Sequence, residues 1–477
     1  MTRDYTQIPR SEVKIDTQAV TGPFETWRHS IGQGGVNSQP LSEPIIQAMR
    51  KLQPRLIRVF LQEYFNVYPA HGVFDWSKLD PYMESFAQTG SRVLATINLK
   101  PPVLFPHLDH DLWCPNDVAD WQNLLYQLVR RYSVEKPLIT HWEHVNEPDI
   151  GVWGGCPYRI PSAAELHEFY VMNLQPILAA FPAAKVGSPC TADYLAVPAF
   201  VDCCAQHGTQ LDFVSYHRYQ DDPQFHRLIA KTLSEKLDHY PGKRPELMIN
   251  EWNKGFEPPW SSTAYDAVSV DEMAYQSRRA AHTAQILLTM LNLADEGIRL
   301  DWSFYFLLWD GCMHPADFAT FFSPADAKAI MYKHWNEAPH RFGLFSENGL
   351  PRPQYFVYQI LSRMGEERLR VTHSTPDLGI AAARSGGRVS VLVNNFDLQA
   401  SRDQVVKLCF SRLPPGLKRL TARRIDEDRH WSPETMELLP YEQRLVDTLD
   451  EFEYQFFSPA DSVLFVTLED RHDRDQE

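Results

Sequence analysis

The feature that most limits the fold is a regular alternation of apolar, strand-like runs with amphipathic helical patterns. Eight runs, each followed by a helical pattern, occur between residues 26 and 365. The strand-like runs are residues 26–31, 56–60, 93–97, 139–145, 184–188, 213–216, 247–249 and 303–308. The helical patterns are residues 42–52, 77–87, 116–132, 162–181, 194–206, 223–239, 269–295 and 354–363. Eight such alternations predict an α/β fold, a (β/α)₈ TIM barrel.

An open, doubly wound sheet is the alternative that the same alternation allows. Such sheets usually carry a glycine-rich phosphate loop between the first strand and a capped helix. The stretch Gly32-Gln33-Gly34-Gly35 is rich in glycine, but no capped helix follows it at the right distance. The sequence therefore favours the closed barrel over a dinucleotide-binding sheet.

A second pattern begins near residue 366, where apolar residues alternate with period two. Residues 378–383 and 388–394 flank a Ser-Gly-Gly turn and predict a hairpin, and further strands are expected at 405–410, 419–424 and 463–468. We expect the barrel over residues 26–365 and an antiparallel β-sandwich over 366–470. The alternating strand within residues 1–25 should join the sandwich, since an unpaired strand needs a partner. The highly charged residues 471–477 predict a disordered tail.

Two glutamates stand at the ends of predicted strands. The fourth strand runs into Asn146-Glu147-Pro148, and the seventh into Asn250-Glu251. In a barrel the C-terminal ends of the strands form the active site, and strands four and seven lie roughly opposite each other. Two facing carboxyl groups suit the cleavage of a glycosidic bond, in which one donates a proton and the other attacks or stabilises the anomeric carbon. The sequence alone does not set their separation, which decides between retention and inversion.

Charge and composition limit the partners. The net charge of −15 disfavours nucleic acid and anionic membranes, and no apolar run is long enough to span a bilayer. The first residues lack the apolar core of a signal peptide, and the seven cysteines show no framework spacing, so we expect a cytoplasmic protein. The 107–111 turn, His-Leu-Asp-His-Asp, resembles a metal site, but we interpret it as a solvated turn. We expect no metal and no cofactor.

The strand-four Asn146-Glu147-Pro148 together with Glu251 resembles the clan A retaining glycoside hydrolases. Within the clan the chain is most similar to family 39, which holds β-xylosidases and α-L-iduronidases. Supporting features are Arg58 on strand two, the 214–217 run on strand six, and the 341–345 and 351–355 stretches. The resemblance implies a retaining mechanism, with Glu147 as acid/base and Glu251 as nucleophile. It also implies Asn146 at a sugar hydroxyl and His217 or Tyr219 near the nucleophile.

Several positions depart from the xylosidases of that family. Those enzymes carry a histidine in the turn after strand one, where Gly35 or Val36 stands here, and another two residues after the strand-two arginine, where Phe60 stands. They carry acidic residues after strand eight, where Asp310 could substitute. An iduronidase would need cations for a substrate carboxylate, for which Arg159 or Arg218 could serve. These departures leave the terminal sugar open.

Aromatic side chains near the predicted strand ends could stack on sugar rings, whose C–H faces are apolar. Trp252 and Trp309 are the main candidates for such a platform. Trp153 and Tyr158 lie in the glycine-rich loop 151–158, which follows Glu147 directly and could shape the pocket. The insertion 311–340 is expected to cover one side of the mouth, which favours an exo-acting pocket.

The prediction is therefore an exo-acting retaining glycosidase that takes a short oligosaccharide or glycoside, with β-xylosides first. A β-galactosidase, β-glucosidase, α-L-arabinosidase or α-L-iduronidase-like enzyme is the alternative. A barrel that binds carbohydrate without cleaving it is a third hypothesis, which the presence of both glutamates disfavours. The linkage and the oligomeric state stay open at this point.

Overall fold

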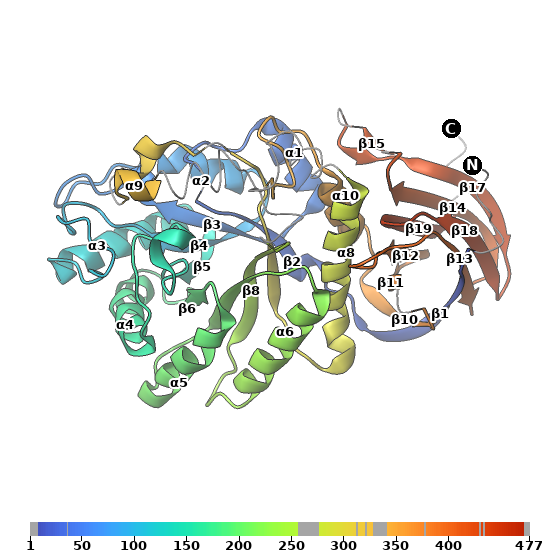
Figure 1. The fold of residues 1–477 in the computed structure, drawn as a ribbon, viewed down its shortest axis with the longest axis horizontal. Coiled ribbons are helices and arrows are strands. Elements are labelled where there is room, and N and C mark those ends of the chain that lie inside the picture. The colour runs from blue at the N-terminus through green and yellow to red at the C-terminus, as the bar shows by residue number, and fades with distance from the viewer. Residues whose placement is uncertain are drawn as a thin grey trace.

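The computed structural model places a barrel beside a curved sheet (Figure 1). It describes residues 8–35, 37–255, 276–311, 313–319, 322–327, 341–375, 378–428, 431–432 and 435–471. The predicted tail after residue 471, the 269–275 start of one predicted helix and much of the 311–340 insertion lie outside these residues. Within the described part of the chain, no helix is long and apolar enough to cross a bilayer.

Eight parallel strands close the barrel in the order of the chain. They are β2 (His29–Gln33), β3 (Leu56–Gln62), β4 (Arg92–Asn98), β5 (Ile139–Glu143), β6 (Lys185–Thr191), β7 (Phe213–Tyr219), β8 (Glu246–Asn253) and β9 (Trp302–Phe306). The first strand closes on the last, because Ser30 of β2 pairs with Phe304 of β9. The TIM-barrel prediction is confirmed, and all eight strands overlap their predicted runs.

Helices cover the outside of the barrel and bury its apolar outer face (Figure 1). They are α1 (Glu43–Leu52), α2 (Leu79–Ala87), α3 (Val118–Val129), α4 (Ala163–Ala180), α5 (Val197–His207), α6 (Pro223–Asp238), α8 (Ser277–Asn292) and α10 (Pro353–Ser362), with the short α9 (Pro324–Ala327) in the insertion. Ser162 caps α4 by accepting a hydrogen bond from the backbone N–H of Glu165. Each helix follows the strand that its position in the sequence predicts.

A sheet of nine strands makes up the second region, in the order β17-β14-β19-β12-β11-β10-β1-β13-β18. Its strands are β1 (Arg10–Pro23), β10 (Glu367–His373), β11 (Leu378–Ser385), β12 (Arg388–Asn395), β13 (Gln404–Ser411), β14 (Gly416–Ile425), β17 (Pro440–Thr448), β18 (Phe452–Ser458) and β19 (Ser462–Asp470), and the two-residue strands β15 (Trp431–Ser432) and β16 (Glu437–Leu438) pair separately. The N-terminal β1 lies antiparallel to β10 and parallel to β13. The sequence therefore predicts correctly that an N-terminal strand joins this sheet.

The sheet curls so that its two edge strands meet. The hydroxyl groups of Tyr441 on β17 and Tyr454 on β18 lie 3.1 Å apart, although these strands stand at opposite ends of the strand order. Inside the curl lies a separate apolar core that includes Val13 and Ile15 of β1. On the outer face, Leu392 and Phe465 join the main core, and α8 packs between them and the barrel. This arrangement anchors the sheet to the barrel wall.

Candidate active site

The inside of the barrel is built in layers, and the lowest layer is apolar. It closes the N-terminal end and consists of Leu56, Leu94, Phe213, Met248, Trp302 and Phe304, with Trp27 packed against it. Two residues further along the strands, the inward positions become polar: Arg58, Thr96, Glu143 and Ser215 are all almost fully buried. Polar groups buried this deeply need partners, and they bond to one another. The layer above them carries the two glutamates.

Glu251 lies within β8, and an irregularity in that strand turns it inward. Tyr216 of β7 pairs with Ile249, and the next β7 residue, His217, pairs with Glu251. Asn250 is therefore an extra residue, as in a β-bulge, which re-aims the following side chain. Because of the bulge, Asn250 and Glu251 both reach groups inside the barrel.

Glu147 lies in the loop four residues beyond the end of β5, which stops at Glu143. Its φ of +44° is unusual for a residue with a side chain, and its backbone N–H donates to the carbonyl of Cys190 at 2.8 Å. The loop then turns into a short 3₁₀ helix, Gly151–Gly154. A Cβ at Gly154 would lie 2.2 Å from Oε2 of Glu147, so only glycine fits there.

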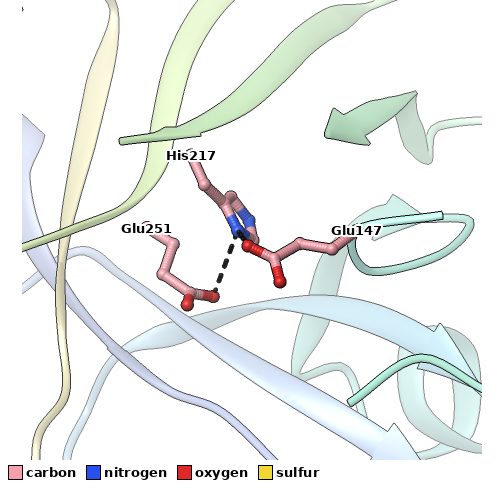
Figure 2. Close-up of side chains that lie close together, drawn as sticks. All are labelled: Glu147, His217 and Glu251. Atoms are coloured by element: carbon pink, nitrogen blue, oxygen red, sulfur yellow. Dashed lines mark hydrogen bonds and ion pairs between the residues drawn. The ribbon is translucent and has the colours of Figure 1, made fainter. Parts of the chain in front are cut away.

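The two carboxyl groups face each other across His217 (Figure 2). Nδ1 of His217 lies 2.7 Å from Oε1 of Glu147 and 3.6 Å from Oε2 of Glu251. One oxygen of each glutamate and this nitrogen all lie within 4.8 Å of one another. Both glutamates are largely withdrawn from solvent, with 8% and 6% of their surfaces exposed.

Arg58 joins Glu251 to a second, fully buried carboxylate, Glu143. Its Nη1 donates to Oε2 of Glu251 at 2.9 Å, while Nε and Nη2 donate to Glu143 at 3.1 and 2.9 Å. Glu143 also accepts from Thr96, Ser215 and Asn250, so its oxygens are saturated. A charge-assisted fork of this kind fixes the guanidinium, and with it one face of Glu251.

The surroundings of the two glutamates differ in the way that acid and nucleophile require. Burial raises the pKa of Glu147 to about 8, and the nearby Asp149 adds to the effect. Burial and the nearby Glu147 also raise the pKa of Glu251, but the contacts with His217, Arg58 and Tyr219 offset a part of this shift. Burial lowers the pKa of His217 to about 4, which leaves the imidazole neutral at pH 7. Of the two carboxyl groups, Glu147 therefore keeps its proton longer as pH rises.

Glu147, His217 and Glu251 are spaced closely enough to hold a cation. Among the described residues, they are the group whose potential ligand atoms lie this close together. The site does not suit one. Nη1 of Arg58 already lies 2.9 Å from Glu251, and a fixed guanidinium so close repels a metal ion. Within the described residues, no side chain of the 107–111 turn belongs to a group with the spacing of a cation site.

Comparison with known proteins identifies the family. The model of glycosyl hydrolases family 39 matches residues 12–436. The chain belongs to this family. A β-xylosidase from Caldicellulosiruptor saccharolyticus is 21% identical over 356 residues, which cover 69% of this chain and 65% of the relative, less than two thirds of its length.

Solved structures agree with the fold of this family 39 chain. A monomeric β-xylosidase from Caulobacter crescentus CB15 aligns with a TM-score of 0.73 at 18% identity, covering 97% of this chain and 100% of the other. A GH39 enzyme from Xanthomonas axonopodis pv. citri aligns with a TM-score of 0.74 at 18% identity, covering 99% and 100%. At identities this low, the alignments show only that the architecture of barrel and sheet is shared.

In this family 39 chain, four of the residues predicted from the sequence to bind substrate or assist catalysis lie at the two glutamates. Arg58, His217 and Tyr219 contact them directly, and the Tyr219 hydroxyl donates to Glu251. Asn146 reaches them through its partners, because its Oδ1 accepts from Arg58 at 2.8 Å. Its Nδ2 donates to the Gly154 carbonyl. Trp309 is half-buried beyond the end of β9, and Trp153 is 61% exposed beside Gly154, so their sugar contacts stay predictions.

Two predicted sugar contacts are wrong. Trp252 follows the inward Glu251 and faces outward into the core, against His226 and Tyr305. Tyr158 is fully buried and donates to the Leu99 carbonyl. The oxygens of Asp310 accept from Arg352 and from the Gly343 N–H, so Asp310 stabilises the loop, and its contact with a sugar stays a prediction.

The two cations considered for a uronate also lie elsewhere. Arg218 lies over the Phe225 ring, 4.8 Å from its centroid, and Arg159 is a surface residue near Asp111. In contrast, sequence reasoning missed Glu143, Cys190 and Asn250, which complete the site. The signal for Glu143 was present, because a charged residue in a buried strand must find a partner inside the barrel.

Proposed function

We propose that this family 39 protein is an exo-acting, retaining glycosidase that removes a terminal sugar from short glycosides, with β-xylosides as the first candidate substrate. The observation that carries the mechanism is the proximity of Glu147 and Glu251, whose nearest oxygens lie within 4.8 Å of each other. Retaining enzymes place their carboxyl groups about 5–5.5 Å apart, whereas inverting enzymes need about 6.5–9.5 Å for a water molecule.

In the first step, a carboxylate oxygen of Glu251 attacks the anomeric carbon while Glu147 gives its proton to the leaving oxygen. The bond from the anomeric carbon to that oxygen breaks, and a glycosyl ester forms on Glu251. Arg58 and Tyr219 hold the attacking carboxylate in place. Their hydrogen bonds favour its ionised form before the reaction.

In the second step, Glu147 takes a proton from water, and the water oxygen attacks the anomeric carbon. The ester bond breaks and Glu251 returns to its carboxylate form. Esterification has removed the charge of Glu251, which lowers the pKa of Glu147 and suits it to act as a base. Two inversions at one carbon give net retention.

The β-xyloside is supported by the relatives, since the Caldicellulosiruptor and Caulobacter proteins are both described as β-xylosidases. A second candidate is a different terminal sugar. Phe60 favours it, because its ring lies at a position where the family's xylosidases carry a histidine. The Arg58 guanidinium lies 4.4 Å from the centroid of this ring. A phenyl ring there cannot make the hydrogen bonds that an imidazole makes.

A panel of aryl glycosides tests the proposal with wild type, Glu147→Ala and Glu251→Gly. We expect turnover by wild type with retained configuration, and a large loss in both variants. Azide should restore Glu251→Gly and give a glycosyl azide of inverted configuration, whereas with Glu147→Ala it should give a retained product. Wild-type turnover in both variants would refute the roles. Initial products other than a monosaccharide and the oligosaccharide shortened by one unit would refute exo action.

A further inference from the structure

Cys190 lies directly behind the imidazole of His217, on the side away from the two glutamates. Its Sγ is 3.2 Å from Nε2 of His217, while Nδ1 of the same ring faces Glu147 and Glu251. The side chain of Cys190 is fully buried, and its backbone carbonyl accepts from the N–H of Glu147. One residue thus contacts both the histidine and the loop that carries Glu147.

The hydrogen bonds around the sulfur determine where its proton can go. Nη2 of Arg58 donates to Sγ at 3.1 Å, and Nδ2 of Asn250 donates to it at 3.4 Å. Both groups can only donate, so the sulfur acts as their acceptor. Burial raises the pKa of the Cys190 thiol well above its usual range, which keeps the S–H proton in place.

Three acceptors lie within reach of that proton. The Glu143 carboxylate also bonds to the thiol, but it already accepts five other hydrogen bonds. Oδ1 of Asn146 is 3.7 Å away and already accepts from Arg58 at 2.8 Å. Nε2 of His217 is nearer than Oδ1 of Asn146, at 3.2 Å, and within the described residues the sulfur is its hydrogen-bond partner. A neutral imidazole carries one N–H, so a thiol that donates to Nε2 leaves the ring proton on Nδ1.

We propose that Cys190 is a positioning residue that holds His217 as its Nδ1–H tautomer and thereby places the acidic proton of Glu147 on Oε2. The Nδ1–H group donates to Oε1 of Glu147, so Oε1 acts as the acceptor and the proton belongs to the other oxygen. Oε2 is the oxygen that lies against Gly154, and Figure 2 shows one carboxyl oxygen turned to the ring and one turned away. The proposal about the tautomer stands by itself, and its catalytic meaning rests on the proposed function.

The same arrangement serves both steps of the reaction. When Oε2 has given its proton to the leaving group, Nδ1–H still donates to Oε1 and stabilises the new carboxylate. The carboxylate keeps its orientation and can accept the proton of water on Oε2. The reverse tautomer would instead hold the Glu147 proton on Oε1, pointing at the ring and away from a substrate.

The titratable and charged groups around the His217 ring come from four strands and one loop. They are Arg58 of β3, Glu143 of β5, Glu147 and Asp149 of the following loop, Cys190 of β6 and Glu251 of β8. Substitution of Cys190 leaves all the others in place. It therefore changes one hydrogen bond to the ring without changing the charges that face it.

The direct test is long-range ¹H–¹⁵N NMR on protein labelled at histidine nitrogen, with the His217 signals assigned by their loss in His217→Asn. We expect Nδ1 protonated in wild type and in Cys190→Ser, whose hydroxyl also donates, and a mixture or the Nε2–H form in Cys190→Ala. Cys204→Ala is the matched control, because Cys204 is equally buried but lies on α5. An Nε2–H tautomer in wild type, or a Cys190→Ala spectrum equal to wild type, would overturn the proposal.

Rates give a second readout. Cys190→Ala should lower kcat/KM about tenfold, a part of the 10²–10⁴-fold that a positioned acid/base contributes, and should shift the alkaline limb of the pH profile. Cys190→Ser should restore both. If no glycoside is turned over but the tautomer is Nδ1–H and depends on Cys190, the proposed function fails while the positioning role stands. If turnover is normal and the tautomer is Nε2–H, the positioning role of Cys190 fails while the proposed function stands.

Discussion

Nη1 of Arg58 lies 2.9 Å from Oε2 of Glu251, and the other two nitrogens of the guanidinium group hold Glu143. One cation therefore serves two buried carboxylates. The contact with Glu251 lowers the pKa of that group, while the contact with Glu143 fixes the cation. The ionisation of the proposed nucleophile thus depends on a residue in the middle of another strand.

Replacing Arg58 with Met should raise the pKa of Glu251, because the positive charge beside the carboxylate is lost. The acid limb of the pH profile of kcat/KM should move to higher pH, and kcat/KM should fall about 100-fold at its optimum, as when an oriented donor is removed. Glu143 would be left buried without its cation, at a cost of about 3–5 kcal/mol in the free energy of unfolding. Arg58→Lys keeps the charge and should move the limb less.

Steady-state rates across pH and urea unfolding measure these effects. Arg227→Met is a suitable control, since Arg227 forms a surface ion pair with Glu296 and is 40% exposed. An unshifted acid limb in Arg58→Met would contradict the proposed link between Arg58 and Glu251.

The raised pKa of Glu147 predicts the alkaline limit of activity. Burial sets this pKa at about 8, and the protonated form is the one that donates to the leaving group. kcat/KM should therefore be maintained below pH 8 and fall as pH rises through that value. Glu147→Gln should lose this limb on glycosides with good leaving groups, which need no acid, and should be inactive on poor ones. Equal losses on both kinds of leaving group would argue against an acid/base role.

Gly154 controls the position of Glu147, so Gly154→Ala should displace the carboxyl group. The new methyl would lie 2.2 Å from Oε2, and a shift of about 1 Å at a catalytic group can cost about 100-fold in rate. The neighbouring Gly155→Ala is the matched control: its φ is +69°, but nothing lies within 4 Å of a Cβ there. It should lose about 1 kcal/mol of stability through backbone strain and keep its kcat/KM. Similar kcat/KM values for the two variants would contradict the steric argument.

The Lys100 ammonium group connects the loop that contains residues 109–112 with the loop that contains Pro157. Its Nζ donates to the carbonyls of Asp109, Leu112 and Pro157 at 2.6, 2.8 and 3.1 Å. Lys100→Met removes all three bonds and should lower the free energy of unfolding by about 2–3 kcal/mol. It should also lower kcat/KM, because Pro157 belongs to the loop that carries Gly154. Lys14→Met is the control, since the Lys14 side chain is 71% exposed. Unchanged unfolding of Lys100→Met in urea would show that the three bonds contribute little.

Glu63 should make the stability depend on pH. Burial raises its pKa to about 8, as it does for Glu147, against an ordinary value of 4.5. Between these pH values the folded protein binds the protons more tightly than the unfolded chain does. The free energy of unfolding should therefore fall as pH rises from about 4.5 to 8.

Glu63→Gln imitates the protonated form, so its stability relative to wild type should increase with pH. Urea unfolding at pH 5, 6, 7 and 8 measures the difference, with the exposed Glu84→Gln as control. A difference that does not change with pH would contradict the raised pKa of Glu63.

The sequence was sufficient for the barrel and for the two glutamates, for identifiable reasons. Each barrel strand is an apolar run that is buried on both faces, and each helix has its own apolar stripe. Glu147 and Glu251 follow asparagine at the ends of such runs. The chain order of the strands then placed them opposite each other, since barrel strands are adjacent in sequence order.

The wrong predictions came from treating neighbours in sequence as neighbours in space. Trp252 stands next to Glu251, but successive side chains of a strand point to opposite faces, so it had to face the helices. For Asp310, whose sugar contact stays a prediction, the partner Arg352 could not be identified without the fold. The sequence did not indicate a role for Cys190, because its contacts with Arg58 and His217 join three different strands.

The position of β1 has a consequence for the order of synthesis. This strand leaves the ribosome before the barrel strands do, but its partners β10 and β13 begin at residues 367 and 404. The whole barrel is translated in between. During that time Val13 and Ile15 have no sheet to pack into, and the growing chain must keep them from other strand edges. A strand that is made before the barrel is thus paired only after the barrel has been translated.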